Sequence, residues 1–501
     1  MELSSFPEDI QQYIIPEKKG IYEYHCLKCQ KQWDINHLLY TCPDCGHVLM
    51  IEDQQFDRLK TISAKKWHKI FNYRKLLNIN GLKGIFRFHE FLGSVLPVED
   101  LVYLGEGHTP MIEANSILQE KLGIRFHYKN DGQNPSASFK DRGMACALSY
   151  INSLIRAGKL SEILAICAST GDTSAAAALY GSYLAPHIKT AVLLPHKKVT
   201  PQQLSQPLGS GAKVFEIPGV FDDCMKIVES LADHYHVALL NSKNAWRILG
   251  QESYSYEIAQ DFEYNLRNVA IIVPIGNAGN ITAVMNGFIK FFKAGVIEDL
   301  PRIIGVQSHH ADPVFKYYQQ KEPDKRNFQP VMVKPSVAQA AMIGNPVSMP
   351  RVIDRVKQYD HLSGKENVFF VQVTEQDIMD WQIQANQNGH IACTHGGECL
   401  AGMVKAINNK IIDNRFQVVL DSTAHALKFA GFQDLYFQDT FPEEFGIKPK
   451  NELKNYPKLI KPENTPVPTS GQPLAPEKFK QFVEKTSAEI ASCLNLKKRT
   501  S

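Results

Sequence analysis

Short apolar runs alternate with longer stretches of helical periodicity through most of the chain. Each run has the length of a strand and is apolar at successive positions, as expected for strands of a parallel sheet that helices cover on both faces. In such folds, ligands bind beyond the carboxyl ends of the strands, where helix N-termini gather. The pattern predicts an α/β fold with parallel sheets. The runs are residues 162–168, 190–194, 213–217, 269–275, 302–306, 368–373 and 416–420.

The regions outside this alternation have a different character. Residues 55–100 mix basic, aromatic and apolar side chains at helix-like spacing, which predicts connecting helices without chemistry of their own. In residues 448–476, prolines recur among polar residues, which indicates an extended segment. Residues 477–494 return to helical spacing and predict a terminal helix.

Composition and charge exclude several classes of protein. A chain of 501 residues with 44% hydrophobic and 21% charged residues is globular and long enough for more than one core. Its net charge of +3 gives no support for binding to nucleic acid or to a membrane surface. The first residues lack the apolar core of a signal peptide, and runs such as 269–275 are far shorter than a membrane span. We therefore expect a cytoplasmic protein.

Four of the ten cysteines form two pairs near the N-terminus, and the others are scattered through apolar segments. This usage is typical of a reducing compartment and not of a disulfide framework. The paired residues, Cys26 with Cys29 and Cys42 with Cys45, are two Cys-x-x-Cys motifs that together supply the four thiolates of a tetrahedral zinc site. With four sulfur ligands the zinc would be structural. The alternative is redox-active or incidental cysteine pairs.

A polar, turn-prone segment at residues 134–143, Asn-Pro-Ser-Ala-Ser-Phe-Lys-Asp-Arg-Gly, leads into small and apolar residues that predict a buried helix. Lys140 therefore lies at the start of a helix, where the positive end of the helix dipole disfavours its charged form. A lysine that is neutral near pH 7 can hold an aldehyde as a Schiff base. The alternative is a lysine whose ammonium reaches solvent from the helix start.

Two loops that follow predicted strands have the composition of anion cradles. Residues 169–174, Ser-Thr-Gly-Asp-Thr-Ser, follow the run that ends at Ala168, and residues 276–280, Gly-Asn-Ala-Gly-Asn, follow the run that ends at Ile275. Hydroxyls and backbone N–H groups at a helix start bind phosphate or carboxylate. The alternatives are an ordinary helix cap and an ordinary glycine turn. The glycine spacing in 276–280 is not that of a dinucleotide-binding fingerprint.

Two further segments carry groups suited to a ligand. Thr423 follows the run that ends at Leu420, where a cap on the next helix is the alternative. Residues 241–247, Asn-Ser-Lys-Asn-Ala-Trp-Arg, bring amides, a hydroxyl and an arginine together. The guanidinium fork of Arg247 suits a phosphate or a carboxylate, and the alternative is an arginine in a surface ion pair.

These motifs together resemble a known family. Residues 138–143, Ser-Phe-Lys-Asp-Arg-Gly, resemble the cofactor-lysine motif of threonine synthases, which use pyridoxal phosphate (PLP) and belong to the tryptophan-synthase-β-like class. Residues 276–280 match the family's phosphate loop letter for letter, and the resemblance covers roughly residues 20–435 with at least five motifs in the family's order. It implies a fold-type-II enzyme with a zinc-ribbon-like module (1–55) and a catalytic region of two α/β domains (56–445). The composition of the remaining residues adds a proline-rich extension with a terminal helix (446–501).

The resemblance also implies roles around the cofactor. Lys140 would hold PLP and act as the catalytic base, and Thr423 would meet the pyridine nitrogen. Asp172 would face the phenolic oxygen, where many members of the family carry asparagine. An aspartate there repels a phenolate unless one of the two holds a proton. The PLP phosphate would lie on Gly276, Asn277, Ala278, Gly279 and Asn280.

For the substrate, the resemblance implies O-phospho-L-homoserine, which water converts to L-threonine and phosphate. Its phosphate would bind Asn241, Ser242 and Arg247 with help from Thr173. The 169–174 loop, with Ser169 and Thr170, would grip its carboxylate. Rival enzymes are threonine or serine dehydratases, which need no second phosphate site, and cysteate synthase. A rival of another class is a catalytically silent zinc-ribbon binding protein. A homodimer is expected from the resemblance alone.

Two other segments are assigned no role. Residues 393–399, Cys-Thr-His-Gly-Gly-Glu-Cys, are interpreted as a loop leading into a helix rather than as a metal or triad site. Residues 343–350 also resemble a family segment, but their turn residues by themselves indicate no chemistry.

Overall fold

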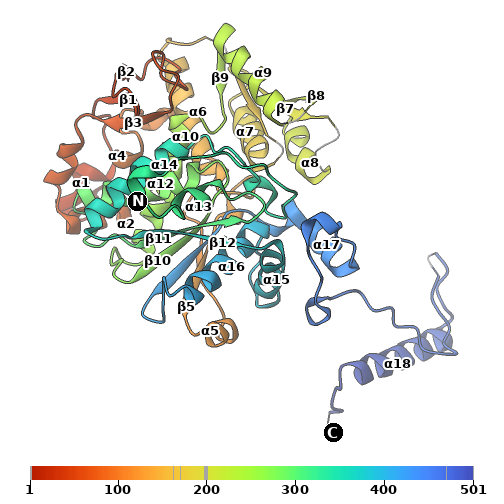
Figure 1. Ribbon diagram of the computed structural model, residues 1–501. Coiled ribbons are helices and arrows are strands. Elements are labelled where there is room, and N and C mark those ends of the chain that lie inside the picture. Colours follow the sequence, from red (N-terminus) through yellow and green to blue (C-terminus); the bar gives the residue numbers. More distant parts are fainter. Residues whose placement is uncertain are drawn as a thin grey trace. The chain divides into compact units, whose positions relative to one another are not determined.

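A computed structural model describes residues 3–161, 163–169, 171–196, 201–219, 221–469 and 471–499 (Figure 1). The chain divides into two compact units, Met1–Lys450 and Asn451–Ser501. All of the residues with expected chemistry belong to the first unit. Within the described residues, no helix has both the length and the apolar composition needed to cross a membrane.

The larger sheet of the first unit has six strands in the order β12-β11-β10-β13-β5-β4. All neighbours are parallel except β4 and β5, which pair antiparallel at one edge. The central strand β10 is buried along its whole length, which explains its continuous run of apolar residues. The strands are β4 (Met111–Glu113), β5 (Arg125–Asn130), β10 (Val269–Pro274), β11 (Arg302–Ser308), β12 (Val368–Val373) and β13 (Gln417–Ser422).

The smaller sheet has four parallel strands in the order β8-β7-β6-β9. Helices lie against both sheets (Figure 1). The predicted α/β class with mostly parallel sheets is therefore confirmed. The strands are β6 (Ile163–Ala168), β7 (Ile188–Pro195), β8 (Lys213–Ile217) and β9 (Val237–Leu239). The main helices are α6 (Lys140–Arg156), α7 (Asp172–Tyr183), α9 (Phe221–His234), α10 (Ala245–Gln251), α11 (Ser253–Asp261), α12 (Gly279–Lys293), α14 (Met349–Ser363), α15 (Glu375–Gln387), α16 (Thr394–Asn408) and α17 (Ala430–Gln438).

The N-terminal cysteines belong to a small antiparallel sheet in the order β2-β1-β3. Its strands are β1 (Tyr22–Cys26), β2 (Gln32–Asp34) and β3 (Leu49–Asp53). This sheet shares the hydrophobic core of the first unit, and the hydroxyl of Tyr24 accepts a hydrogen bond from Trp246 Nε1 at 3.1 Å. The N-terminal module is thus packed onto the rest of the unit. In the chain, helix α1 (Glu8–Ile14) precedes this sheet and helix α2 (Ala64–Arg74) follows it, and α2 lies in the region predicted to be helical.

The second unit is extended through most of its proline-rich part and ends in helix α18 (Pro476–Cys493). This helix occupies the stretch whose spacing predicts one. None of its side chains is buried.

Candidate active site

A cavity of about 680 Å³, counting the part open to solvent, collects residues from segments far apart in the chain. It lies at the carboxyl ends of β10 and β13, where the N-termini of α6, α10 and α12 meet. Five of the sequence motifs contribute to its walls. The lining residues are Phe139, Lys140, Asp172, Ser242, Arg247, Ile248, Gln251, Pro274, Gly276, Asn277, Ala278, Gly279, Asn280, Ala340, Ala341, His395 and Thr423.

Lys140 is the first residue of α6, as its sequence context predicts. Its side chain keeps part of its surface open to the cavity, yet the surrounding protein desolvates the amine. This desolvation, followed by the positive charge of Arg247, lowers the pKa of Lys140 to about 7. The backbone N–H of Phe139 donates to the carbonyl of Thr423 at 2.8 Å and fixes the start of the helix. A large fraction of the amine is therefore neutral near pH 7 and able to attack an aldehyde.

Two glycines bring α6 and α10 close enough for their first turns to face one cavity. A Cβ atom at Gly143 would lie 2.9 Å from the carbonyl oxygen of Arg247, closer than real Cβ contacts allow. A Cβ atom at Gly250 would likewise lie 2.5 Å from the Cβ atom of Cys146. Each glycine follows its functional cation, Lys140 or Arg247, by three residues, so it lies on the same helix face. The glycine contact therefore sets the separation of the two cations.

The 276–280 turn is built to receive an anion. Ala278 adopts the left-handed conformation (φ +61°) at the N-cap of α12, so the free N–H groups of the first helical turn point beyond the helix end. A side chain at Gly276 would lie 2.9 Å from Ala341 Cα. Two bonds fix the turn: Ser348 N–H donates to the Asn277 carbonyl at 3.1 Å, and Asn280 Nδ2 donates to Asp421 at 2.6 Å.

Arg247 is 2% exposed and projects into the same cavity. Its Nη1 donates to the carbonyl of Leu240 at 2.9 Å, and its Nε has no partner. Among the residues that the structure describes, no carboxylate pairs with it, and burial lowers its pKa to about 10. A buried guanidinium without a counter-ion is costly unless a ligand supplies the negative charge. The surface ion pair considered as an alternative for Arg247 does not occur in this structure.

Asp172, at the start of α7, pairs with a residue that the sequence did not single out for this role. Its carboxylate lies 2.8 Å from Lys428 Nζ, which also donates to the carbonyl of Ser136 at 2.9 Å. Lys428 thereby ties the loops before α6 and α7 to the segment after β13. It also offsets the negative charge that would otherwise repel an anionic oxygen in front of Asp172.

Some predicted substrate residues do not line the cavity. Ser169 accepts a hydrogen bond from the backbone of Gly171 at 3.2 Å, and Thr173 lies in the first turn of α7. Thr170 lies outside the described residues. Asn241 engages Ala168 with both of its side-chain groups, accepting at 3.1 Å and donating at 2.7 Å. In this arrangement Asn241 holds β6 and the 241–247 loop together, which leaves its amide committed to the backbone.

The 393–399 segment, to which sequence analysis assigned no role and which it interpreted as a loop, is the start of α16 and contributes His395 to the cavity wall. Burial lowers the pKa of His395 to about 4, so the ring is neutral, and its Nε2 has no partner. Ala340 and Ala341 precede the 343–350 segment and line the cavity next to Gly276. Turn residues in a sequence do not indicate which cavity the neighbouring side chains line, because that depends on the tertiary structure.

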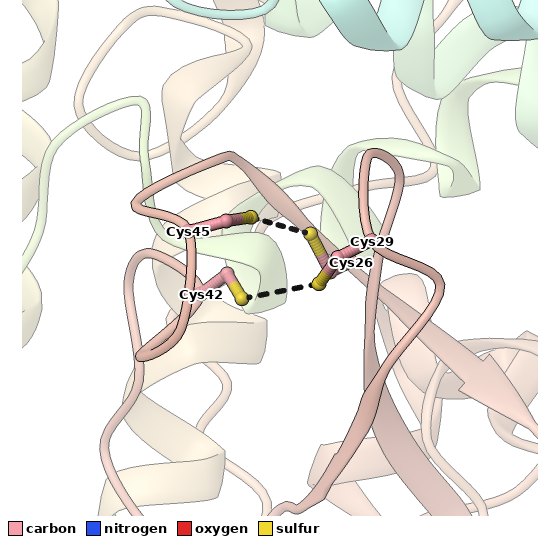
Figure 2. A group of neighbouring side chains, drawn as sticks. All are labelled: Cys26, Cys29, Cys42 and Cys45. Atoms are coloured by element: carbon pink, nitrogen blue, oxygen red, sulfur yellow. Dashed lines mark hydrogen bonds between the residues drawn. The ribbon is translucent and has the colours of Figure 1, made fainter.

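The four N-terminal cysteines converge at the tips of two loops in the small sheet (Figure 2). Cys26 Sγ lies 3.5 Å from Cys45 Sγ, and Cys29 Sγ lies 3.6 Å from Cys42 Sγ. These separations exclude disulfide bonds, whose sulfur atoms are about 2.05 Å apart. They are close to the ~3.8 Å between ligands that tetrahedral zinc–thiolate bonds of about 2.3 Å require.

Comparison with known proteins shows the family to which the chain belongs. The family model described as pyridoxal-phosphate dependent enzyme matches residues 102–421, more than half of the chain. The threonine synthase of Methanocaldococcus jannaschii is 35% identical over 408 residues, 80% of this chain and 92% of that protein. The threonine synthase of Methanosarcina acetivorans is 32% identical over 417 residues, 81% of this chain and 92% of that protein. The chain belongs to the threonine synthase family.

The fold agrees with this membership. The crystal structure of threonine synthase from Escherichia coli superposes with a TM-score of 0.61 and covers 85% of this chain and 94% of its own, at 17% sequence identity. At that identity the likeness concerns the fold alone. The predicted family, the fold class and a PLP-dependent lyase are thus confirmed, and the residues of this threonine synthase family member fit the cofactor. They offer a desolvated amine, a helix N-terminus for a phosphate and, at Thr423, a hydroxyl.

Proposed function

We propose that this protein is a threonine synthase that converts O-phospho-L-homoserine and water to L-threonine and phosphate. One observation carries the proposal: a single cavity contains a desolvated lysine and two separate seats for anions. One seat is the start of α12, and the other is the buried guanidinium of Arg247, for which the described residues offer no carboxylate partner. A cofactor phosphate and a substrate phosphate would fill the two seats.

The geometry of the cavity supports the proposed cofactor residues. Lys140 would bind the aldehyde carbon of PLP, and residues 276–280 would hold its phosphate. The Thr423 hydroxyl would meet the pyridine nitrogen, and the Asp172–Lys428 pair would stand at the phenolic oxygen. When bound, PLP withdraws electrons from the substrate's α carbon and so acidifies protons at the α and β carbons.

Lys140 moves the protons of the reaction. Displaced by the substrate amine, its Nζ would take the proton from the α carbon and pass it to the bound cofactor, so that the amine is neutral again when it takes a proton from the β carbon. Phosphate leaves the γ carbon as this negative charge develops. Lys140 would return the β proton to the γ carbon. Water then adds its hydroxyl at the β carbon, the departed phosphate takes the remaining proton of that water, and Lys140 returns a proton to the α carbon to give threonine. A pKa of about 7 suits both directions of transfer, because the amine and the ammonium are both populated near neutral pH.

Arg247 and Ser242 hold the phosphate until it departs. A guanidinium binds two phosphate oxygens at once, which orients the γ carbon and stabilises the charge that grows on the leaving group. Ser169 and Thr170 are proposed for the substrate carboxylate, and Thr173 is proposed to help hold the phosphate. Asn241 is proposed to act through the backbone of Ala168 and not by direct contact.

Two assays test the proposal. Purified protein should release phosphate and form threonine from phosphohomoserine faster than it deaminates threonine or serine. Faster deamination would favour a dehydratase, and phosphoserine turnover with sulfite would favour cysteate synthase. Lys140→Ala should abolish the visible absorbance of lysine-bound cofactor and reduce turnover by at least about 10⁴-fold. Failure of the wild-type protein to take up PLP would support a catalytically silent binding protein.

The four N-terminal cysteines are proposed to hold a structural zinc ion. Two cysteine pairs at tetrahedral spacing with no open ligand position support a closed site. Metal analysis should find one zinc per chain in the wild-type protein, and Cys26→Ser should lower that content without removing bound PLP. Equal zinc content in both proteins would exclude this site.

The remaining proposals concern organisation. We place the zinc module at residues 1–55, the catalytic region at 56–445 and the proline-rich extension at 446–501, in a cytoplasmic homodimer. Light scattering of the purified protein gives the oligomeric state. Expression of residues 56–445 alone tests whether the zinc module is dispensable. The core that it shares with the rest of the first unit predicts poor folding without it.

A further inference from the structure

Arg351, on the first turn of α14, is completely buried, and all five of its N–H groups are used. Nε and Nη2 donate to the carbonyl of Leu49 at 3.1 and 2.6 Å. Nη1 donates to the carbonyl of Ser242 and to the Ser348 hydroxyl, both at 3.0 Å, and Nη2 also donates to the carbonyl of Lys243 at 3.0 Å. Every acceptor is a neutral oxygen.

These bonds join three parts of the chain that are remote in sequence. Leu49 begins β3 of the N-terminal sheet, and Ser242 and Lys243 belong to the loop that leads to Arg247. Ser348 donates its backbone N–H to Asn277 in the turn proposed for the cofactor phosphate. One side chain therefore holds the backbone of the proposed substrate-phosphate loop against the zinc module.

The same loop touches the zinc module through neighbouring residues. Trp246 donates to Tyr24 of β1 at 3.1 Å and stacks on Tyr150 of α6 at a centroid distance of 4.1 Å. Ile248, which lines the cavity, packs against Met50 of β3. The residues on either side of Arg247 are thus fixed by the N-terminal sheet, while Arg247 itself is free to meet a ligand.

We propose that Arg351 is a positioning residue for the substrate phosphate, clamping the Ser242–Lys243 backbone onto β3 so that Ser242 and Arg247 converge on the same anion. This inference rests on the proposed function, because it assumes that a phosphate occupies the Arg247 seat. It assigns the N-terminal module a role in substrate binding in addition to stability. It also places a second buried cation, for which the described residues offer no acidic partner, against the backbone of the loop that carries Ser242.

The test compares phosphate binding in PLP-loaded Arg351→Met, Arg351→Lys and wild-type protein, measured by calorimetry with inorganic phosphate as the probe. Arg351→Met should weaken phosphate binding and raise KM for phosphohomoserine by at least about tenfold, with kcat changed less than about threefold. Arg351→Lys keeps the charge but has three donors, so its effect should be intermediate. Arg355→Met is the matched control: one turn further along α14, Arg355 bonds Asn286 and Asp354 and does not touch the loop.

A second variant keeps the test informative if Arg351→Met does not fold. Trp246→Phe keeps the stacked ring but removes the bond to Tyr24, and it should weaken phosphate binding by about two- to fivefold with cofactor absorbance unchanged. Phosphate binding and KM within twofold of wild type in Arg351→Lys and Trp246→Phe would overturn the inference. Loss of PLP from the same variants would also overturn it, because that loss would indicate a general loosening of the cavity. If wild-type protein neither binds phosphate nor converts phosphohomoserine, the proposed function itself fails, which is a distinguishable result.

Discussion

Arg142 and Arg247 are both buried cations on helices that touch, yet their surroundings are opposite. Arg142 donates to Asp131 at 2.7 Å and to Glu257 at 2.8 Å, with Ser253 and Thr109 taking further N–H groups. These carboxylates raise its pKa well above the usual value. Arg247 makes one bond to a backbone carbonyl, and burial lowers its pKa.

The difference indicates that Arg142 stabilises the fold, whereas Arg247 is placed to bind a ligand. Two carboxylates compensate the charge of Arg142 inside the protein, so the folded chain is complete without a ligand there. The charge of Arg247 is compensated by no described residue, so the folded chain bears a cost that an anion removes on binding. Stability and substrate affinity should therefore respond in opposite ways to loss of the two guanidinium groups.

The largest expected effect on stability comes from Arg142. Arg142→Met removes the guanidinium that pairs with buried Asp131 and Glu257, leaving Asp131 with the Thr109 hydroxyl and Glu257 with Lys129, and it should lower the free energy of unfolding by about 3–5 kcal/mol. Urea denaturation of the PLP-loaded protein measures the change. A loss below about 1 kcal/mol would mean that the network around Arg142 is not the anchor that its contacts indicate.

Arg247→Met should show the reverse pattern. Because the removed charge has no carboxylate partner among the residues that the structure describes, the free energy of unfolding should stay the same or rise. Loss of the phosphate contact should lower kcat/KM for phosphohomoserine by about 10²–10³-fold. The two readouts are urea denaturation and phosphate release. Equal turnover by variant and wild type would remove Arg247 from the phosphate seat.

The glycine contact between the two helices offers a sharper test of the geometry. Gly143→Ala places a methyl group against the Arg247 carbonyl, so α10 must shift, at an expected cost of about 1–3 kcal/mol in stability. The shift should raise KM, because Arg247 and Lys140 then no longer face one substrate. Gly158→Ala is a poor control because its φ is positive, whereas Gly431→Ala meets no neighbouring atom and should leave KM unchanged.

The smallest effect is on the pH at which PLP is captured. The rate at which apoprotein takes up PLP should rise about tenfold per pH unit below 7 and level off above it, because only the neutral amine attacks. The positive charge of Arg247 lowers the pKa of Lys140. Arg247→Met should therefore raise the pH at which the uptake rate levels off. Stopped-flow absorbance measures the uptake rate as a function of pH, with Arg355→Met as control. If the rate of Arg247→Met levels off at the same pH as that of wild type, the two cations are not coupled.

Sequence reasoning worked where one local pattern determined the outcome and failed where partners were remote. The apolar runs and the helix start at Lys140 depend on local periodicity, and the structure has them. Strand β5 escaped detection because its Lys129 is buried by ion pairs with Glu257 at 3.2 Å and Asp261 at 2.8 Å. Hydropathy treats such a lysine as exposed, since nothing in the neighbouring residues reveals its carboxylates.

The sequence by itself determined which reactive and ligand-binding groups are present: a lysine at a helix start, a glycine turn after a strand, four paired cysteines and an arginine among amides. Only the tertiary structure decided which charges remain uncompensated. It gave Arg142 two carboxylates and left Arg247 without one, paired Asp172 with Lys428, and committed Asn241 to the backbone. The physical reason is that the energy of a buried charge depends on groups within a few ångströms in space, and the fold draws those groups from anywhere in the chain.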